Sequence, residues 1–207
     1  MENFFSIDGK FFRFINKFTS LIILNFLFII TSLPIITIGA SFHALYQTNL
    51  RLYQNTESYI ARTYFFYWKK NLKQDILLWI PVIILFIFCL VNLYILPFMP
   101  KTFFRTVTLC IQFLILFLLQ GFLIYVFSLP DQYRPTLKHT VQNAIILTFK
   151  YLPATFLCIC INALPVSIAI LLPKITGYII SVFIIIGFSG ITFLHISILQ
   201  LLLKNNQ

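Results

Sequence analysis

Long runs without Asp, Glu, Lys or Arg are the feature that most constrains this chain. The first run covers residues 18–50, and four more cover residues 76–99, 106–130, 151–173 and 175–203. Each of the last four is long enough to cross about 30 Å of hydrocarbon as a helix. Only 10% of the residues are charged, and they lie between or at the edges of the runs. The sequence therefore predicts an all-α membrane bundle of five or six transmembrane helices, in a single domain over residues 1–207.

The first run is broken near its middle, and the break decides how often the chain crosses the membrane. As one helix, the run would be about 50 Å long, too long for one span and short for two. Pro34 cannot donate a backbone hydrogen bond and disfavours helix at the residue before it, and Gly39 adds a second weak point. Two interpretations follow: a kinked single span, or a hairpin that rises through residues 14–33 and returns through residues 38–53.

The distribution of Lys and Arg favours the hairpin. With a single crossing, the better orientation places nine basic residues on the inner side and six on the outer side. With a hairpin, the numbers become twelve and three, in better agreement with the positive-inside rule. The returning half carries small and polar residues, so we expect it to pack inside the bundle. We also expect both termini to be cytoplasmic.

The remaining elements follow from the same pattern. Residues 3–17 mix Phe with spaced basic residues, as is typical of a helix lying at the membrane interface. Residues 76–129 and 151–203 are expected to form two hairpins with tight turns. A shift of 72 residues aligns Arg62 with Arg134 and Pro81 with Pro153, which indicates a weak internal hairpin repeat or a chance similarity.

The segment between the expected hairpin of residues 14–53 and the hairpin of residues 76–129 is the best candidate for contact with a partner. Residues 53–75 combine aromatic side chains with basic ones and are expected on the cytoplasmic side. An interfacial helix resting on anionic lipid headgroups explains the same residues. The basic residues form no continuous stripe, so we expect no nucleic-acid partner. The candidate contact residues are Arg62, Tyr64, Phe65, Trp68, Lys69, Lys70 and Lys73.

No motif of a catalytic, cofactor or metal site is present in the sequence, and we expect no enzymatic activity. All five acidic residues lie outside or at the edges of the uncharged runs, which argues against a coupled transporter, because such transporters keep an ionisable group within their spans. Polar side chains inside the runs are candidates for interhelical contacts or for a polar permeation path. They are His43, Asn92, Gln112, Gln120, Asn162 and His195.

The break also carries a family resemblance. The segment Leu-Pro-x-x-Thr-x-Gly-Ala at residues 33–40 resembles the YesL family, also known as domain of unknown function 624 (DUF624). Its family-motif residues in this chain are Asn25, Pro34, Thr37, Gly39, Ala40 and Ser41. Further similar segments lie at residues 3–5, 13–14, 24–28, 44–46, 59–60, 71–74, 79, 142–144 and 152–153. Residues 135–140 depart from the family pattern, which has an aromatic-rich stretch there.

The resemblance implies a multi-pass protein of the bacterial cell membrane, without an established activity. Members of the family are often encoded beside carbohydrate ABC transporters and glycan-degrading enzymes. The resemblance therefore suggests an accessory or regulatory component of carbohydrate uptake, with transporter subunits as partners. A small-solute permease or exporter acting alone is the alternative, and a hydrated, amide-lined cavity between the hairpins would favour it.

The break also gives an expectation about two glycines. Because Gly39 lies at the expected turn, we expect leucine to be tolerated less well there than at Gly121.

Overall fold

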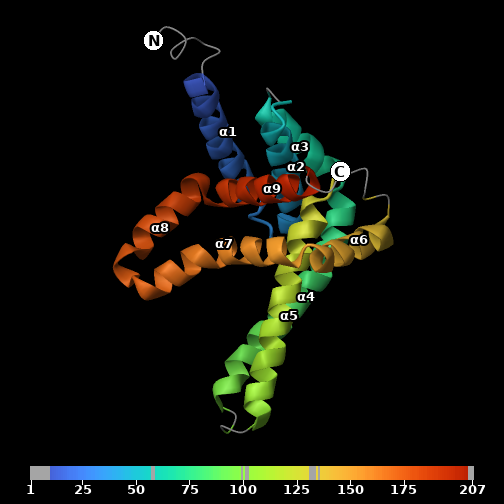
Figure 1. Cartoon of the computed structure of the whole chain (residues 1–207), viewed down its shortest axis with the longest axis vertical. Helices are drawn as coiled ribbons and strands as arrows, with labels where there is room; N and C mark the ends of the chain where they lie inside the picture. The colour runs from blue at the N-terminus through green and yellow to red at the C-terminus, as the bar shows by residue number, and fades with distance from the viewer. Residues whose placement is uncertain are drawn as a thin grey trace.

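A computed structural model of the chain describes residues 10–204, apart from residues 57–58, 99, 101–102, 131–133 and 135. Within these residues the regular structure is helical and no strand is present, which confirms the predicted all-α fold. Figure 1 shows a central group of helices from which two hairpins extend.

The chain reverses direction at the break in its first uncharged run. Helix α1 (Lys10–Thr31) runs toward the centre of the molecule, and α2 (Ile38–Tyr53) runs back beside it (Figure 1). Between them, the Thr37 hydroxyl donates to the carbonyl oxygens of Thr31 and Pro34, each at 2.8 Å. The bond to Thr31 satisfies a carbonyl group that the end of α1 leaves without an intrahelical partner. Helix α1 continues through Lys17 without a break, and residues 3–9 of the expected interfacial helix lie outside the described residues.

Two long apolar hairpins follow. The first consists of α4 (Leu72–Ile95) and α5 (Phe103–Ser128). The second consists of α7 (Leu152–Leu171), the short α8 (Thr176–Val182), a π-helical turn (Phe183–Gly187) and α9 (Phe188–Lys204). In the described residues, four helical segments are long and apolar enough to cross a membrane: Leu72–Phe98, Phe103–Ser128, Leu152–Leu171 and Pro173–Leu201. The chain is thus a membrane protein by the length and composition of its helices.

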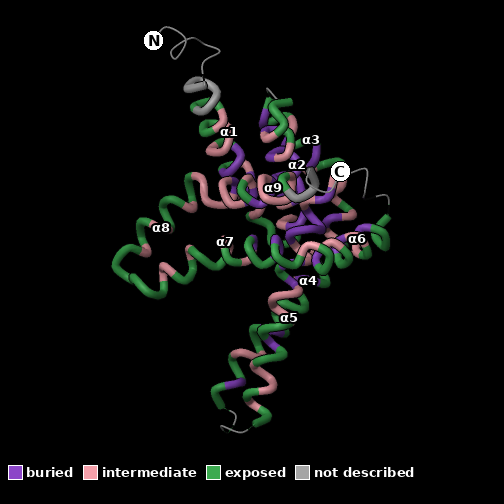
Figure 2. The backbone as a smooth tube through the Cα atoms, viewed as in Figure 1, coloured by how far each residue is buried: buried purple, intermediate pink, exposed green. Residues whose placement is uncertain are grey.

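The two hairpins run crosswise and do not form a parallel bundle. The α4–α5 hairpin points away from the centre in one direction, and the hairpin of α7, α8 and α9 points in another (Figure 1). Their outer ends are largely exposed, whereas buried residues gather where the hairpins meet α2 (Figure 2). Apolar side chains at the outer ends therefore lack protein neighbours within the described structure and need lipid or another chain to cover them.

Helix α2 forms the centre of the core. From Gly39 to Asn49 every residue except Phe42 is buried. The small residues Ala40 and Ala44 let neighbouring helices approach closely, as is typical of helix contacts in membranes. The burial of α2 confirms the expectation that the returning half packs inside the bundle.

Two shorter helices, α3 (Ile60–Lys70) and α6 (Leu137–Lys150), each precede a hairpin. The order of elements therefore recurs, as the predicted repeat implies. The residue pairing does not: Arg62 is exposed on α3, whereas Arg134 is buried before α6. Likewise, Pro81 lies inside α4, whereas Pro153 lies in the first turn of α7. A shift of 72 residues thus does not align equivalent positions.

Candidate functional site: a buried ion pair and an apolar cavity

Asp75, at the start of α4, is completely buried and forms an ion pair. Its carboxylate accepts a hydrogen bond from Arg134 Nη2 at 2.5 Å, and its second oxygen lies 2.9 Å from His43 Nδ1 on α2. The prediction that all five acids are peripheral is therefore wrong for Asp75. The physical reason is its helical register: Asp75, Leu78 and Val82 share the face of α4 that packs against the core.

The ion pair joins α2, α4 and the connection between α5 and α6. Nearby, Gln47 Nε2 donates to the carbonyl oxygen of Leu129 at 2.8 Å, and Gln74 Nε2 donates to Thr140 Oγ1 at 3.1 Å. The same region is therefore held by a charge pair and by neutral hydrogen bonds. Neither Asp75 nor Arg134 lines the cavity described below, so the arrangement supports a structural role.

The family-motif residues bring α2 and α4 into close contact. A Cβ atom built on Gly39 would lie 2.7 Å from Trp79 Cβ and 2.9 Å from the carbonyl oxygen of Asp75. Trp79 Nε1 also donates to the carbonyl oxygen of Ile35 at 2.9 Å, which ties the turn to α4. The motif residue Ser41 is fully buried and donates to Thr37 O at 3.1 Å. Gly39 is needed for close helix packing, and its backbone is not in the left-handed region.

Asn25 on α1 binds the π-helical turn between α8 and α9. Its Nδ2 donates to the carbonyl oxygens of Phe183 at 3.0 Å and Ile184 at 2.7 Å. Its Oδ1 accepts from the backbone N–H of Ser189 at 3.0 Å. A π-helical turn shifts the regular hydrogen-bond ladder, and a side-chain amide can satisfy the backbone groups that the shift releases. The Asn25 side chain therefore fixes the second hairpin against α1.

Helix α3 has one buried face and one exposed face. Tyr64 is fully buried, with its hydroxyl 2.6 Å from Thr31 Oγ1 and 3.5 Å from Ser41 O. Burial raises the pKa of Tyr64 to about 12, although its hydrogen bonds to Thr31 and Ser41 act in the opposite direction. The assignment of Tyr64 as a contact residue is therefore wrong, because Ile60, Tyr64 and Tyr67 recur on the helix face that packs inward.

The other predicted contact residues remain accessible. Trp68 is half-buried, and the remaining side chains form an exposed surface that we call the α3 surface. Lys70 Nζ lies 5.6 Å from the centre of the Phe66 ring, so Phe66 belongs to the same face as the basic residues. The α3 surface consists of Arg62, Phe65, Phe66, Lys69 and Lys70 on α3, together with Lys73 at the start of α4.

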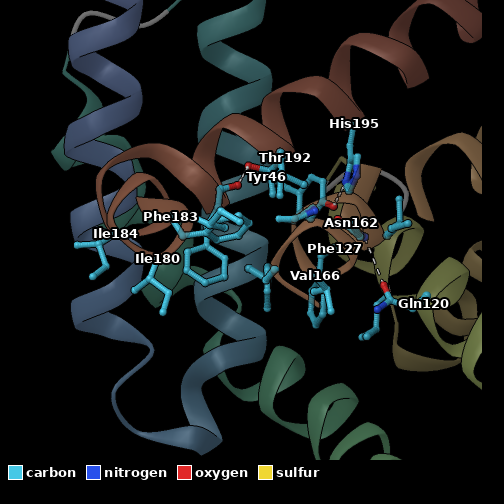
Figure 3. Close-up of a pocket in the computed structure, with 18 of the residues that line it drawn as sticks. Tyr46, Gln120, Phe127, Asn162, Val166, Ile180, Phe183, Ile184, Thr192 and His195 are labelled. Carbon is cyan, nitrogen blue, oxygen red and sulfur yellow. Dashed lines mark hydrogen bonds between the residues drawn. The ribbon is translucent and has the colours of Figure 1, made fainter. Parts of the chain in front are cut away.

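A cavity of about 770 Å³ lies beside α2 and between α5, α7, α8 and α9 (Figure 3). Two polar pairs line it: the Tyr46 hydroxyl lies 2.8 Å from His195 Nδ1, and Asn162 Nδ2 donates to Gln120 Oε1 at 3.3 Å. Most other lining residues are Leu, Ile, Val and Phe, and none of the described lining residues is Asp, Glu, Lys or Arg. In size the cavity lies within the range of small-molecule sites in proteins.

The structure separates the polar residues that were grouped by sequence. His43 contacts Asp75 and His195 contacts Tyr46, so the two histidines belong to different sites. Gln112 is buried and donates to the Cys89 carbonyl at 3.1 Å, joining α5 to α4. Asn92 is half-buried on α4 and does not line the cavity. Among the residues described, no group of three or more His, Cys, Asp or Glu side chains could hold a metal ion.

Comparison with known families identifies the region that contains the break. The family model described as "Protein of unknown function, DUF624" matches residues 21–93, from the middle of α1 into α4. Comparisons with curated proteins and with solved structures give no match. Asn25, Gly39, His43 and Asp75 all lie in the matched region. Residues 21–93 of this helical membrane protein are thus similar to the DUF624 family, whose function is unknown.

Proposed function

We propose that this chain is a non-catalytic accessory or regulatory component of a carbohydrate ABC transporter. The proposal starts from the resemblance to the YesL family, whose members are often encoded beside such transporters. A protein in this role needs a surface for its partner and needs no reactive centre. The observation that carries the proposal is the α3 surface, where Phe65 and Phe66 are exposed beside basic side chains.

The chemistry of the α3 surface is suited to binding. Phe65 is 40% exposed and Phe66 is 57% exposed, although both belong to a helix whose opposite face is buried. Exposed aromatic side chains and Arg are enriched at protein interfaces, and neighbouring Lys side chains add charge that attracts a partner of opposite sign. Anionic lipid headgroups would also bind the basic residues, so the lipid surface is expected to hold α3 in position for its partner.

The buried polar groups support a role without catalysis. Asp75, Asn25 and Gln47 bind other parts of the fold through their side chains, and each bond joins distant parts of the chain. Such bonds stabilise a fold and do not activate a nucleophile or a water molecule. In this proposal the protein lies in the bacterial cell membrane, with both termini and the α3 surface on the cytoplasmic side, as the distribution of Lys and Arg favours.

A stand-alone permease is the second candidate function. The cavity beside Gln120 and Asn162 is the observation in its favour, since amide groups can bind a polar solute. Its predominantly apolar lining is less suited to a hydrated solute such as a sugar. Uptake of radiolabelled sugars into vesicles reconstituted with this chain alone tests the permease.

A pulldown from the native membrane tests the accessory role. The tagged chain is extracted in a mild detergent, and co-purifying proteins are identified by mass spectrometry against a membrane protein of similar abundance. We expect a carbohydrate ABC permease or its ATPase in near-equal amounts. Recovery of this chain alone would contradict the proposal.

Substitutions on the α3 surface test whether it is the binding site for the partner. The triple variant Lys69→Gln, Lys70→Gln, Lys73→Gln should lose the co-purifying subunits. The matched control is Lys138→Gln with Lys150→Gln, which removes exposed charges from α6 instead. Equal recovery of the partner from both variants would show that the α3 surface does not bind it.

A further inference from the structure

We propose that the cavity between α5, α7, α8 and α9 binds a lipid-like molecule that has an apolar chain and an uncharged, hydrogen-bonding head group. This inference is independent of the proposed function, because the cavity lies apart from the α3 surface. It rests on the distribution of polar side chains along the cavity, on the absence of charged groups among its described lining residues, and on the exposed apolar residues at its edge.

The cavity has a polar end and an apolar end. Figure 3 shows His195, Asn162 and Gln120 toward one end and Ile180, Phe183 and Ile184 toward the other. All six residues line the same space. A ligand that matches this lining has polar atoms at one end only, as a lipid with a small head group has. A sugar or another solute that is polar on all sides would place hydroxyl groups against the apolar end without partners.

The amide pair leaves hydrogen-bonding capacity at the polar end. Asn162 and Gln120 share one hydrogen bond, from Nδ2 to Oε1. Each side-chain amide can donate two hydrogen bonds and accept two. Both residues lie within candidate membrane-spanning helices, where hydrocarbon offers no partner for an amide. A hydroxyl or ester group can both bind these amides and remain soluble in a bilayer.

The polar end also contains the Tyr46–His195 pair. The tyrosine hydroxyl lies 2.8 Å from His195 Nδ1, which orients the imidazole ring. Neither this pair nor the amide pair carries a fixed charge. A head group with a phosphate or a carboxylate would therefore enter without a cation to balance it, so the lining selects an uncharged head group.

The edge of the cavity shows where the ligand comes from. Val166 and Ile170 on α7 and Ile180 on α8 line the cavity, and they are 60%, 72% and 54% exposed. They belong to helices that are long and apolar enough to cross a membrane, so the opening between them faces the bilayer rather than water. A molecule dissolved in the membrane can enter along this apolar edge.

Photolabelling of the full-length chain in lipid nanodiscs tests the proposal. The probe is a monoacylglycerol with a diazirine on its acyl chain, and the labelled residues are located by mass spectrometry. Two further probes serve as comparisons. A diazirine alkane has no head group, and a diazirine fatty acid above its pKa has a charged head group. We expect the monoacylglycerol to label residues 166–170 and 179–184 about tenfold more than either probe does. Labelling spread evenly over all apolar helices, or equal labelling by the three probes, would overturn the proposal.

Two variants separate the cavity from general contact with lipid. Val166→Trp fills the apolar edge, whereas Val182→Trp places the same side chain at a similarly exposed valine, 55% against 60%, that does not line the cavity. Labelling by the monoacylglycerol should fall about tenfold in the first variant and stay unchanged in the second. Equal labelling of both variants would contradict the site.

A polar-end variant keeps the test independent of steric effects. Gln120→Leu combined with Asn162→Leu removes the amides and leaves the cavity open. This variant should lose most of the preference for the monoacylglycerol over the alkane, because the amide contacts to the head group are lost. A preserved preference for the monoacylglycerol would contradict the role of the two amides in binding the head group.

Lipids extracted from the purified wild-type protein then identify the natural source of the ligand. Enrichment of a neutral lipid points to the bilayer, and its absence points to a diffusible lipophilic compound.

Discussion

Arg134 donates a hydrogen bond to the Asp75 carboxylate across 59 positions of the sequence, and both side chains are buried. The pair connects the DUF624 region, which ends at residue 93, to the chain between α5 and α6. Because His43 on α2 contacts the second carboxylate oxygen, the ion pair holds three parts of the chain at one point. Loss of one charge would leave the other buried without its partner, which is the costly case for buried ion pairs.

The variant Arg134→Gln should be strongly destabilised. It leaves Asp75 buried without its cationic partner, so we expect the free energy of unfolding to fall by about 3–5 kcal/mol. The matched control Arg62→Gln removes an exposed arginine and should change it by less than about 0.5 kcal/mol. Denaturant titration of the purified protein in detergent measures both. Similar stabilities for the two variants would show that the ion pair is not needed for the fold.

Close packing at Gly39 predicts an effect of a single methyl group. A Cβ atom there would lie 2.7 Å from Trp79 Cβ, so Gly39→Ala should force α2 and α4 apart and lower stability by about 1–3 kcal/mol. The control Gly177→Ala adds the same methyl group where nothing lies within 4 Å, and it should be neutral or slightly stabilising. Thermal unfolding compares the two. A neutral Gly39→Ala would contradict the close contact.

Gly121 is not a suitable comparison for Gly39. A Cβ atom on Gly121 would lie 2.7 Å from Thr148 Cγ2 and 2.9 Å from Thr155 Cγ2. Both glycines therefore lie in close contacts, and the structure gives no reason for leucine to be tolerated better at Gly121 than at Gly39. Gly121 lets α5 approach α6 and α7, and the sequence pattern around it does not show these contacts because both partners are more than 25 positions away.

Asn25 should be needed to hold the second hairpin. Asn25→Leu removes three hydrogen bonds to residues 183–189, and from the strength of such bonds in membrane proteins we expect a loss of about 2 kcal/mol. The same substitution at the half-buried Asn92 should have little effect. Limited proteolysis between α7 and α9 reports the loosened hairpin. Equal cleavage of both variants would argue against this role for the amide.

The reversal between α1 and α2 makes a prediction about membrane topology. Reporters that are active only in the cytoplasm, fused at residue 7 and at residue 55, should both give a signal because the two ends of the hairpin lie on the same side. A reporter between α4 and α5 should be inactive. Opposite signals at residues 7 and 55 would contradict the hairpin.

The fold class was predictable because the hydrocarbon core imposes a simple rule on sequence. Charged residues interrupt the chain where helices end, and Pro34 cannot continue the helix that begins before it. The crosswise arrangement of the hairpins was not predictable, because the outer faces of both are uniformly apolar and carry no pattern that selects a neighbour. The π-helical turn is hidden in the same way by the run Phe183-Ile184-Ile185-Ile186.

The contacts of the candidate site were harder to predict from the sequence than the fold class. A signal for the buried Asp75 exists, since the spacing to Leu78 and Val82 places it on the apolar face of α4. Its partner Arg134 follows from no local pattern, because the contact depends on how the first hairpin returns. The pairing of Gln120 with Asn162 likewise depends on the approach of α5 and α7, although each residue was recognised as an intramembrane polar side chain.

Photocrosslinking at Phe66 in the native membrane tests most directly whether this protein acts by binding a transporter. A photoreactive amino acid replaces Phe66 on the α3 surface, and in a control it replaces Tyr178, an exposed aromatic residue on α8. A crosslink from position 66 to a carbohydrate ABC transporter subunit, absent from position 178, is the expected result. Lipid adducts alone at position 66, or the same protein adducts from both positions, would contradict the proposed role.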